Sequence, residues 1–193
     1  MLGLKLPTDP RWANIAEKNI DEILTDHAFC EQKAASYAIS LIIGYPELSD
    51  LVAAMGDLAR EEMEHFQMVH KRITDRGLTL GRERKDAYVG KIAAFFPQTH
   101  DRMIRLVNRL LVAALIEARS CERFKVLSEN IADKELAAFY AELMASEAGH
   151  YTLFLKLARQ YGKRKMVDEK WQSLLTFEAE VMKNLGNKEL IHG

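Results

Sequence analysis

Two motifs of the form Glu-x-x-His, Glu62 to His65 and Glu147 to His150, constrain the fold of this chain more than any other feature. Each lies within a long proline-free stretch rich in Ala, Leu, Glu, Lys and Met, which are strong helix formers. Residues three positions apart in a helix share a face, so each Glu and its His can reach a common point. Two such helices facing each other would supply four ligands to a pair of metal ions.

The composition predicts one globular domain spanning residues 1–193. With 193 residues and 48% hydrophobic content, the chain can bury one substantial core. Its 27 basic and 28 acidic residues give a net charge of -1, so any contact with nucleic acid must be local. The two cysteines, Cys30 and Cys121, can form neither a disulfide framework nor a four-thiolate site.

The sequence also predicts a cytoplasmic protein without membrane contact. Residues 1–7 lack the charged start and the following apolar stretch of a signal peptide. No apolar segment approaches the roughly 20 residues that cross a bilayer. The low cysteine content agrees with a reducing compartment.

Hydrophobic periodicity predicts an all-α fold, because the four prolines and ten glycines lie mostly between periodic segments. Short links join the long helices in pairs, and residues 76–98 form a long link with one short helix. This connection is typical of a ferritin-like four-helix bundle with one long crossover, plus additional N- and C-terminal helices. The expected helices span about residues 10–24, 25–43, 46–74, 99–128, 133–161 and 168–185.

A repeat connects the two motifs. Glu31 precedes Glu62 by 31 residues, and Glu117 precedes Glu147 by 30. Glu31 and Glu117 both interrupt apolar helix faces, where an ionised carboxylate is costly unless it is paired or binds a metal. One Glu from each of two helices plus Glu-x-x-His from each of two others is a di-iron ligand set. The predicted metal ligands are Glu31, Glu62, His65, Glu117, Glu147 and His150.

The charges and donor atoms support this interpretation. Two divalent ions balance four carboxylates, and a site rich in carboxylate and imidazole suits iron or manganese. In an alternative interpretation, the two lone glutamates lie at the edges of their helix faces and the histidines are hydrogen-bonded core residues. His27, one turn before Glu31, is a candidate to support that ligand, whereas His70, His100 and His192 have no partner pattern. Cys30 and Cys121 lie near the predicted ligands, but small buried filler is the favoured role for both.

Local basic clusters are the candidate RNA contacts. One cluster recurs along a single face at the start of a long helix, and the other follows the predicted fourth long helix. With one crossover, both would lie at the same end of the bundle and could bind phosphates. An ordinary solvated helix face is the alternative interpretation. The candidate RNA-binding residues are Arg102, Arg105, Arg109, Lys163, Arg164 and Lys165.

Three segments carry a family resemblance that extends over nearly the whole chain. They are HAFCEQKAA at residues 27–35, EARSCERF at 117–124 and SEAGHYTLF at 146–154. These segments resemble the bacterial tRNA hydroxylases that act on 2-methylthio-isopentenyladenosine beside the anticodon. All six predicted ligands fall at that family's ligand positions.

The resemblance implies an O2-dependent mono-oxygenase with two iron ions that hydroxylates the isopentenyl group. It further implies a tRNA anticodon loop as substrate and an external electron donor, whose identity the sequence does not reveal. We expect a monomer or small homo-oligomer. The alternatives are a rubrerythrin-like peroxidase, which usually brings a four-cysteine iron domain, and a ferritin-like iron-handling protein.

Overall fold

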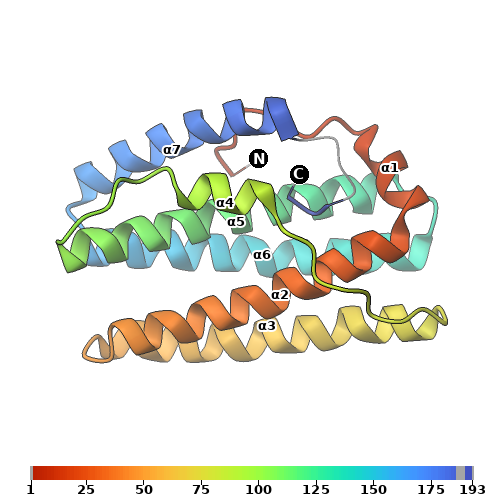
Figure 1. Ribbon diagram of the computed structural model, residues 1–193, viewed down its shortest axis with the longest axis horizontal. Coiled ribbons are helices and arrows are strands. Elements are labelled where there is room, and N and C mark those ends of the chain that lie inside the picture. Colours follow the sequence, from red (N-terminus) through yellow and green to blue (C-terminus); the bar gives the residue numbers. More distant parts are fainter. Residues whose placement is uncertain (1, 186–189, 193) are drawn as a thin grey trace. The chain divides into compact units, whose positions relative to one another are not determined.

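The computed structural model describes residues 2–185 and 190–192, and in that part of the chain all regular structure is helical (Figure 1). This confirms the all-α prediction. No helix in the described part is long and apolar enough to span a bilayer. The helices are α1 (Trp12–Lys18), α2 (Ile20–Gly44), α3 (Ser49–Asp75), α4 (Ala87–Ala93), α5 (Arg102–Asn130), α6 (Lys134–Tyr161) and α7 (Arg164–Leu185).

The helices group into two compact units. The first unit combines the segment up to Lys18 with the segment from Asp86 onward, and the second comprises Asn19–Lys85. Each long hairpin therefore lies within one unit: α2 with α3 in the second, and α5 with α6 in the first. The single-domain description stays a prediction, and each unit is described below by itself.

In the second unit, α2 and α3 pack side by side as an antiparallel hairpin (Figure 1). Leu51, Met55 and Leu58 form the apolar part of the buried stripe of α3, which continues through Glu62 and His65. The hairpin therefore places a carboxylate and an imidazole on the same buried face as its apolar core residues.

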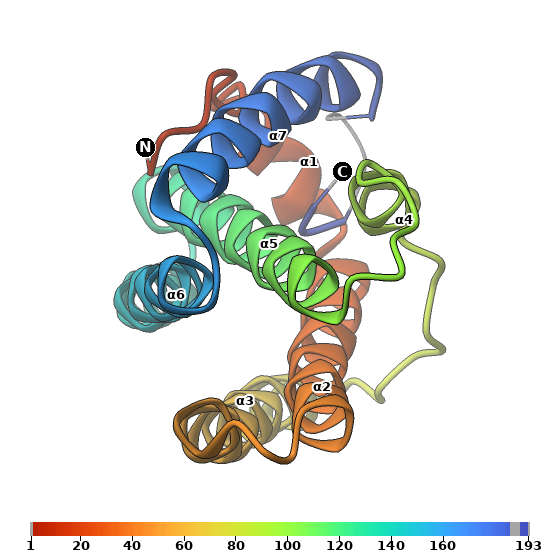
Figure 2. The same ribbon diagram turned by 90° about the vertical axis from the view of Figure 1, so that its left-hand side faces the viewer.

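In the first unit, α5 pairs with α6, and α7 packs on α4, α5 and α6 (Figure 2). Both long helices begin at an aspartate cap: Asp101 accepts hydrogen bonds from the backbone of α5, and Asp133 accepts one from the backbone of α6. Because α5 is covered by α1, α4, α6 and α7, its buried residues are spread around the helix, including polar ones.

A buried ion pair ties several parts of the first unit together. The Arg119 guanidinium donates to Glu178 of α7 at 2.5 Å and to Glu122 of its own helix at 2.9 Å. Arg119 also donates to the carbonyl oxygen of Leu6 at 3.0 Å, and Thr8 donates its backbone N–H to Glu122 at 2.7 Å. Burial lowers the pKa of Arg119, but the nearby Glu178 charge outweighs it, so the pKa lies above its ordinary value. The guanidinium therefore holds α7 and the N-terminal segment on α5.

Two predicted helix boundaries were wrong. The break near residues 24 and 25 lies instead at Asn19, between α1 and α2. Thr25 stays helical and accepts a hydrogen bond from the Gly81 backbone at 3.3 Å, so it stabilises the crossover and caps no helix. The last helix begins at Arg164 and not near residue 168, because Val167 already belongs to its buried face. The predicted short helix in the long link is confirmed as α4.

Candidate metal centre

Three predicted ligands lie together in the second unit. Glu31 projects from α2, while Glu62 and His65 project from α3, and all three are buried. His65 Nδ1 lies 3.8 Å from Glu31 Oε2 and 3.6 Å from Glu62 Oε2. One ligand atom from each residue lies within 4.8 Å of the other two. The α2–α3 hairpin by itself thus presents two carboxylates and one imidazole to a common point.

The pKa values of Glu31 and His65 shift in opposite directions. Burial raises the pKa of Glu31, but hydrogen bonds from His27 and His65 outweigh it, so the pKa lies well below its ordinary value. Burial lowers the pKa of His65, but the neighbouring Glu31 and Glu62 carboxylates raise it to about 10. The neighbouring carboxylates thus favour a protonated imidazole, and surroundings that stabilise this cation also attract metal cations.

The other three predicted ligands lie in the first unit. Glu117 projects from α5, Glu147 and His150 project from α6, and all three are buried. His150 Nδ1 lies 3.9 Å from Glu117 Oε2. Glu147 precedes His150 by three residues on the same helix and therefore shares its face. The α5–α6 hairpin repeats the composition of the α2–α3 hairpin, with two glutamates and one histidine.

The donor chemistry of both hairpins fits iron or manganese. Each hairpin carries two carboxylates, which balance one divalent cation, and one imidazole that completes a mixed oxygen and nitrogen donor set. Burying these carboxylates without a counter-charge would cost several kcal/mol, on the order expected for an uncompensated ion. The chain therefore contains residues suited to binding metal. Their role as ligands to a pair of ions is a proposal.

Neither cysteine is needed as a ligand. Cys121 is buried, and its thiol donates to the Met144 carbonyl oxygen at 3.2 Å. Burial, with a further contribution from the Glu117 charge, raises the pKa of Cys121 to about 11. Since the thiolate is the form that binds metals, this residue acts as a small core side chain. Cys30 is half-buried and forms no disulfide within the described part of the chain.

His27 contacts the predicted ligand Glu31. Its Nε2 lies 2.6 Å from Glu31 Oε1, and its side chain is fully buried. Contacts of this kind fix the orientation of a metal-ligating carboxylate, and their loss typically costs about 10- to 100-fold in metal affinity or activity.

We therefore expect His27→Leu to weaken Fe(II) binding by about 10- to 100-fold, measured by titration of the metal-free protein against a chromogenic chelator. His100→Leu is the matched control, because His100 is exposed. An unchanged Fe(II) affinity in a folded His27→Leu protein would show that this hydrogen bond does not organise the ligand.

The predicted basic residues all lie in the first unit. Arg102 and Arg105 are exposed on the first turn of α5, and Arg109 is half-buried one turn later. A side-chain carbon added at Gly162 would lie 2.9 Å from Val107 Cγ2, so the link between α6 and α7 runs against the beginning of α5. Both predicted clusters therefore lie near this end of α5.

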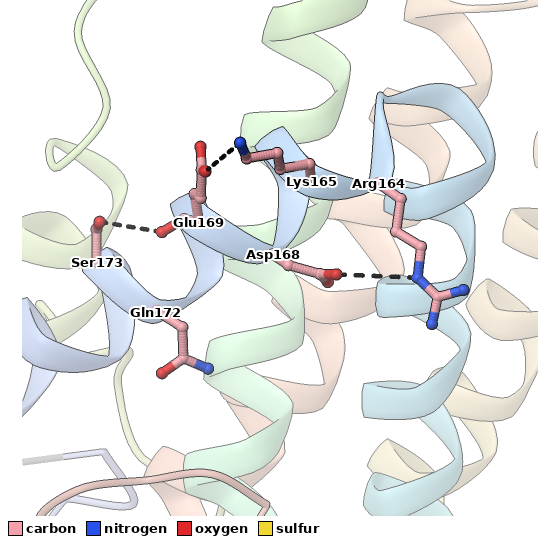
Figure 3. Close-up of a pocket in the computed structure, with 6 residues that line it drawn as sticks. All are labelled: Arg164, Lys165, Asp168, Glu169, Gln172 and Ser173. Carbon is pink, nitrogen blue, oxygen red and sulfur yellow. Dashed lines mark hydrogen bonds and ion pairs between the residues drawn. The ribbon is translucent and has the colours of Figure 1, made fainter.

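The second basic cluster is partly neutralised. Arg164 and Lys165 line an open hollow of about 840 Å³ on α7, together with Asp168, Glu169 and two polar residues (Figure 3). Arg164 Nε lies 3.9 Å from Asp168 Oδ2, and Lys165 Nζ lies 3.9 Å from Glu169 Oε1. Because each cation has a carboxylate one turn further on, we expect this cluster to attract phosphate less strongly than its sequence suggests.

Sequence reasoning missed the surroundings of His192. The sequence offered no partner pattern for this residue, but His192 Nδ1 lies 2.9 Å from Asp86 Oδ2, and its Nε2 lies 3.0 Å from Ser120 Oγ. Its ring also stacks on Tyr88, with centroids 5.6 Å apart. The partners are 106 and 72 residues away along the chain, so no local pattern could have revealed them.

A family model and two named relatives match this sequence, and all three are described as tRNA hydroxylases. The model of a family described as tRNA-(MS[2]IO[6]A)-hydroxylase (MiaE) matches residues 2–193. A Pseudomonas putida protein named tRNA 2-(methylsulfanyl)-N(6)-isopentenyladenosine(37) hydroxylase is 42% identical over 82% of this chain and 76% of its own length. A protein of the same name from Salmonella typhimurium is 30% identical over 81% of this chain and 75% of its own length.

A solved structure shares the fold. It is described as protein 43 with aldehyde deformylating oxygenase activity, from Synechococcus, and it matches with a TM-score of 0.91 and 34% identity. The match covers 98% of this chain and 95% of the other. The fold class predicted from sequence, all-α and ferritin-like, is confirmed by this likeness.

Proposed function

Because this chain belongs to the tRNA-(MS[2]IO[6]A)-hydroxylase family, we propose that it hydroxylates the isopentenyl group of 2-methylthio-isopentenyladenosine next to the anticodon of tRNA. The family match over residues 2–193 is the observation that carries the substrate assignment. The two hairpins with buried Glu and His side chains support the reaction class, an O2-dependent mono-oxygenation.

Two iron ions form the proposed cofactor. In each hairpin, two glutamates and one histidine would hold iron: Glu31, Glu62 and His65 in the α2–α3 hairpin, and the equivalent residues in the α5–α6 hairpin. The burial of all six side chains and the short contacts within each hairpin support this assignment. The complete proposed ligand set is Glu31, Glu62, His65, Glu117, Glu147 and His150.

The iron pair would supply the redox chemistry, in which O2, two electrons from an external reductant and two protons from solvent yield a hydroxylated substrate methyl group and one water molecule. The side chains of the protein hold and shield this centre. His27 fixes the Glu31 carboxylate by its 2.6 Å contact. Cys121 keeps its proton and stays outside the ligand set. The burial of the ligands excludes bulk water, which protects an oxidising site from side reactions.

The tRNA substrate requires a positively charged surface for its phosphates. Arg102 and Arg105, exposed at the start of α5, are the stronger of the predicted contacts in the first unit. Arg109 and the cluster Lys163 to Lys165 are secondary candidates. An electron-transfer partner is also required, because no residue of the chain can supply two electrons in each turnover.

Competing functions give different measurable outcomes. The Synechococcus relative is named for aldehyde deformylating oxygenase activity, so an aldehyde is the appropriate competing substrate. A rubrerythrin-like enzyme would consume peroxide, and a ferritin-like cage would elute from gel filtration as a shell of about 24 subunits. We expect a monomer or small oligomer that is active on tRNA and inactive on the aldehyde.

Nucleoside analysis of tRNA tests the proposal. In cells lacking this protein, the hydroxylated nucleoside should be absent and its isopentenyl precursor should accumulate. Expression of the intact chain should restore the hydroxylated form, whereas expression of a Glu117→Ala chain should not. Unchanged modification in the deleted cells would refute the tRNA substrate but would leave the metal centre open to direct measurement.

A further inference from the structure

One end of the α2–α3 hairpin concentrates positive charge. Residues 66–85, which comprise the end of α3 and the following segment, contain six basic and two acidic side chains. This basic end thus carries a net charge of +4 within a chain whose net charge is -1. Such a local excess is the electrostatic feature expected where a protein of nearly neutral charge binds a polyanion.

A stacked pair of rings lies on the same part of α3. The His70 imidazole stacks on the Phe66 ring, with centroids 6.1 Å apart and planes inclined by 11°. Phe66 is half-buried, so it supports the imidazole from the protein side, while His70 is exposed to solvent. Phe66 also follows the proposed ligand His65 directly. The stacked pair therefore presents a flat ring surface. Along α3 this surface lies close to the proposed metal ligand His65.

Hydrogen bonds from backbone and side chains hold the basic segment against the same end of the hairpin. Gly77 takes a positive φ of 70°, and Leu78 N–H donates to the Ile73 carbonyl at 3.1 Å, which reverses the chain after α3. The segment then runs back beside α2 (Figure 1), where Gly81 donates to Thr25 and Arg84 bonds Glu22 at 2.5 Å.

Two cations of this segment are available to a ligand. Arg82 and Lys85 are exposed, and within the described part of the chain neither has an ion pair. They flank Glu83 and Arg84, whose side chains bind Lys33 and Glu22 of α2. The segment is thus anchored by its middle residues, while the outer two cations remain in solvent.

We propose that this basic end binds single-stranded RNA, with a base stacked on His70 and backbone phosphates bound by Arg82 and Lys85. Unpaired loop bases are recognised by stacking on aromatic and histidine rings, and cationic side chains bind the adjacent phosphates. The assignment of the RNA as the anticodon loop rests on the proposed function. The surface belongs to the second unit, whereas the predicted arginines of α5 belong to the first.

Binding of a fluorescently labelled RNA hairpin, with the sequence of an anticodon stem and loop, tests the stacking contact by anisotropy. His70→Ala should weaken binding by about 5- to 150-fold, the range for loss of one stacked base. His70→Phe should retain most of the affinity, because it keeps a stacking ring. His100→Ala is the matched control, since His100 is also exposed but belongs to the first unit, and it should bind as the unaltered protein does.

Loss of the phosphate contacts should change both the RNA affinity and its dependence on salt. The double variant Arg82→Ala, Lys85→Ala should weaken binding and reduce the slope of log affinity against log salt by about 0.7 for each lost single-strand contact. Lys134→Ala on α6, also exposed, is the control and should change neither quantity. If RNA affinity and salt slope are unchanged in His70→Ala and in the double variant, the proposed surface is wrong.

The experiments can refute the RNA surface and the hydroxylase function independently of each other. Normal hydroxylation by the unaltered protein, together with unchanged RNA affinity in all variants, would overturn the RNA surface alone. RNA binding that depends on His70, in a protein whose deletion leaves tRNA modification unchanged, would support the surface and refute the hydroxylase assignment. Circular dichroism of each variant confirms folding, which exposed substitutions should not disturb.

Discussion

Replacing Glu117 with alanine should abolish hydroxylation and reduce bound iron from about two ions per chain, the content of a di-iron centre. Loss of a carboxylate that supports a ligand already costs up to about 100-fold, so loss of a ligand itself should cost at least as much. Iron content is measured by metal analysis after reconstitution with Fe(II), and activity is measured as hydroxylated nucleoside formed in tRNA.

The same variant makes a second prediction about stability. Glu117 is buried, so its removal eliminates a charge that is costly without a metal. The metal-free variant should therefore be at least as stable to heat as the metal-free parent protein. Glu129→Ala is the matched control, because Glu129 lies on the same helix with a side chain 59% exposed. Full iron content in Glu117→Ala would contradict the ligand role, whatever its activity.

Replacing Arg119 with alanine should cause the largest loss of stability. Its side chain and that of Glu178 are both 0% exposed, and their nearest contact is 2.5 Å. Removing one partner of a buried ion pair leaves an uncompensated charge and typically costs about 3–5 kcal/mol. For a domain of this size, the expected fall in melting temperature is roughly 6–20 °C, measured by calorimetry of the metal-free protein.

Two further variants test whether the loss of stability comes from the buried ion pair. Lys183→Ala breaks an exposed pair with Glu180 and should change the unfolding free energy by less than about 1 kcal/mol. The double variant Arg119→Met, Glu178→Met removes both charges and should be more stable than Arg119→Ala, because no ion stays buried alone. An Arg119→Ala protein that melts as the parent does would show that Arg119 does not hold α7 on α5.

The helices were predictable because helix formation follows local rules. Asp133 was expected to begin a helix, and its side chain accepts the hydrogen bond of an N-cap there. The helix expected to end near residue 74 ends at Asp75, and Gly77 after it takes the positive φ that glycine tolerates. The wrong boundaries at residues 24–25 and 168 have a non-local cause, because buried contacts decided whether those residues joined a helix.

The candidate ligands were also predictable, since a charged residue on an apolar helix face is visible in the sequence. Glu62 and His65 stand on the buried stripe of α3, and the regular spacing to Glu31 identified the third residue of that hairpin. The contact of His27 with Glu31 follows from the same helical spacing of four residues. Periodicity thus determined which side chains share a face and which of them are buried.

Only the tertiary structure revealed the contacts between residues distant in the chain. Arg119 and Glu178 are 59 residues apart, and His192 meets Asp86 across 106 residues. Their pairing depends on which helices pack together, and neither charge nor periodicity of a single segment encodes that choice. The same holds for the basic segment, where only anchoring to α2 distinguishes Arg84, which bonds Glu22, from the exposed Arg82.

The sequence by itself therefore determined the helices, the repeated Glu and His pattern and the resemblance that suggests the substrate. The structure decided which charges are buried in pairs and which stay exposed to bind a partner. The physical reason is the range of the interactions. Helix propensity and amphipathicity act over a few residues, whereas ion pairing in a core depends on contacts that form only when distant segments pack.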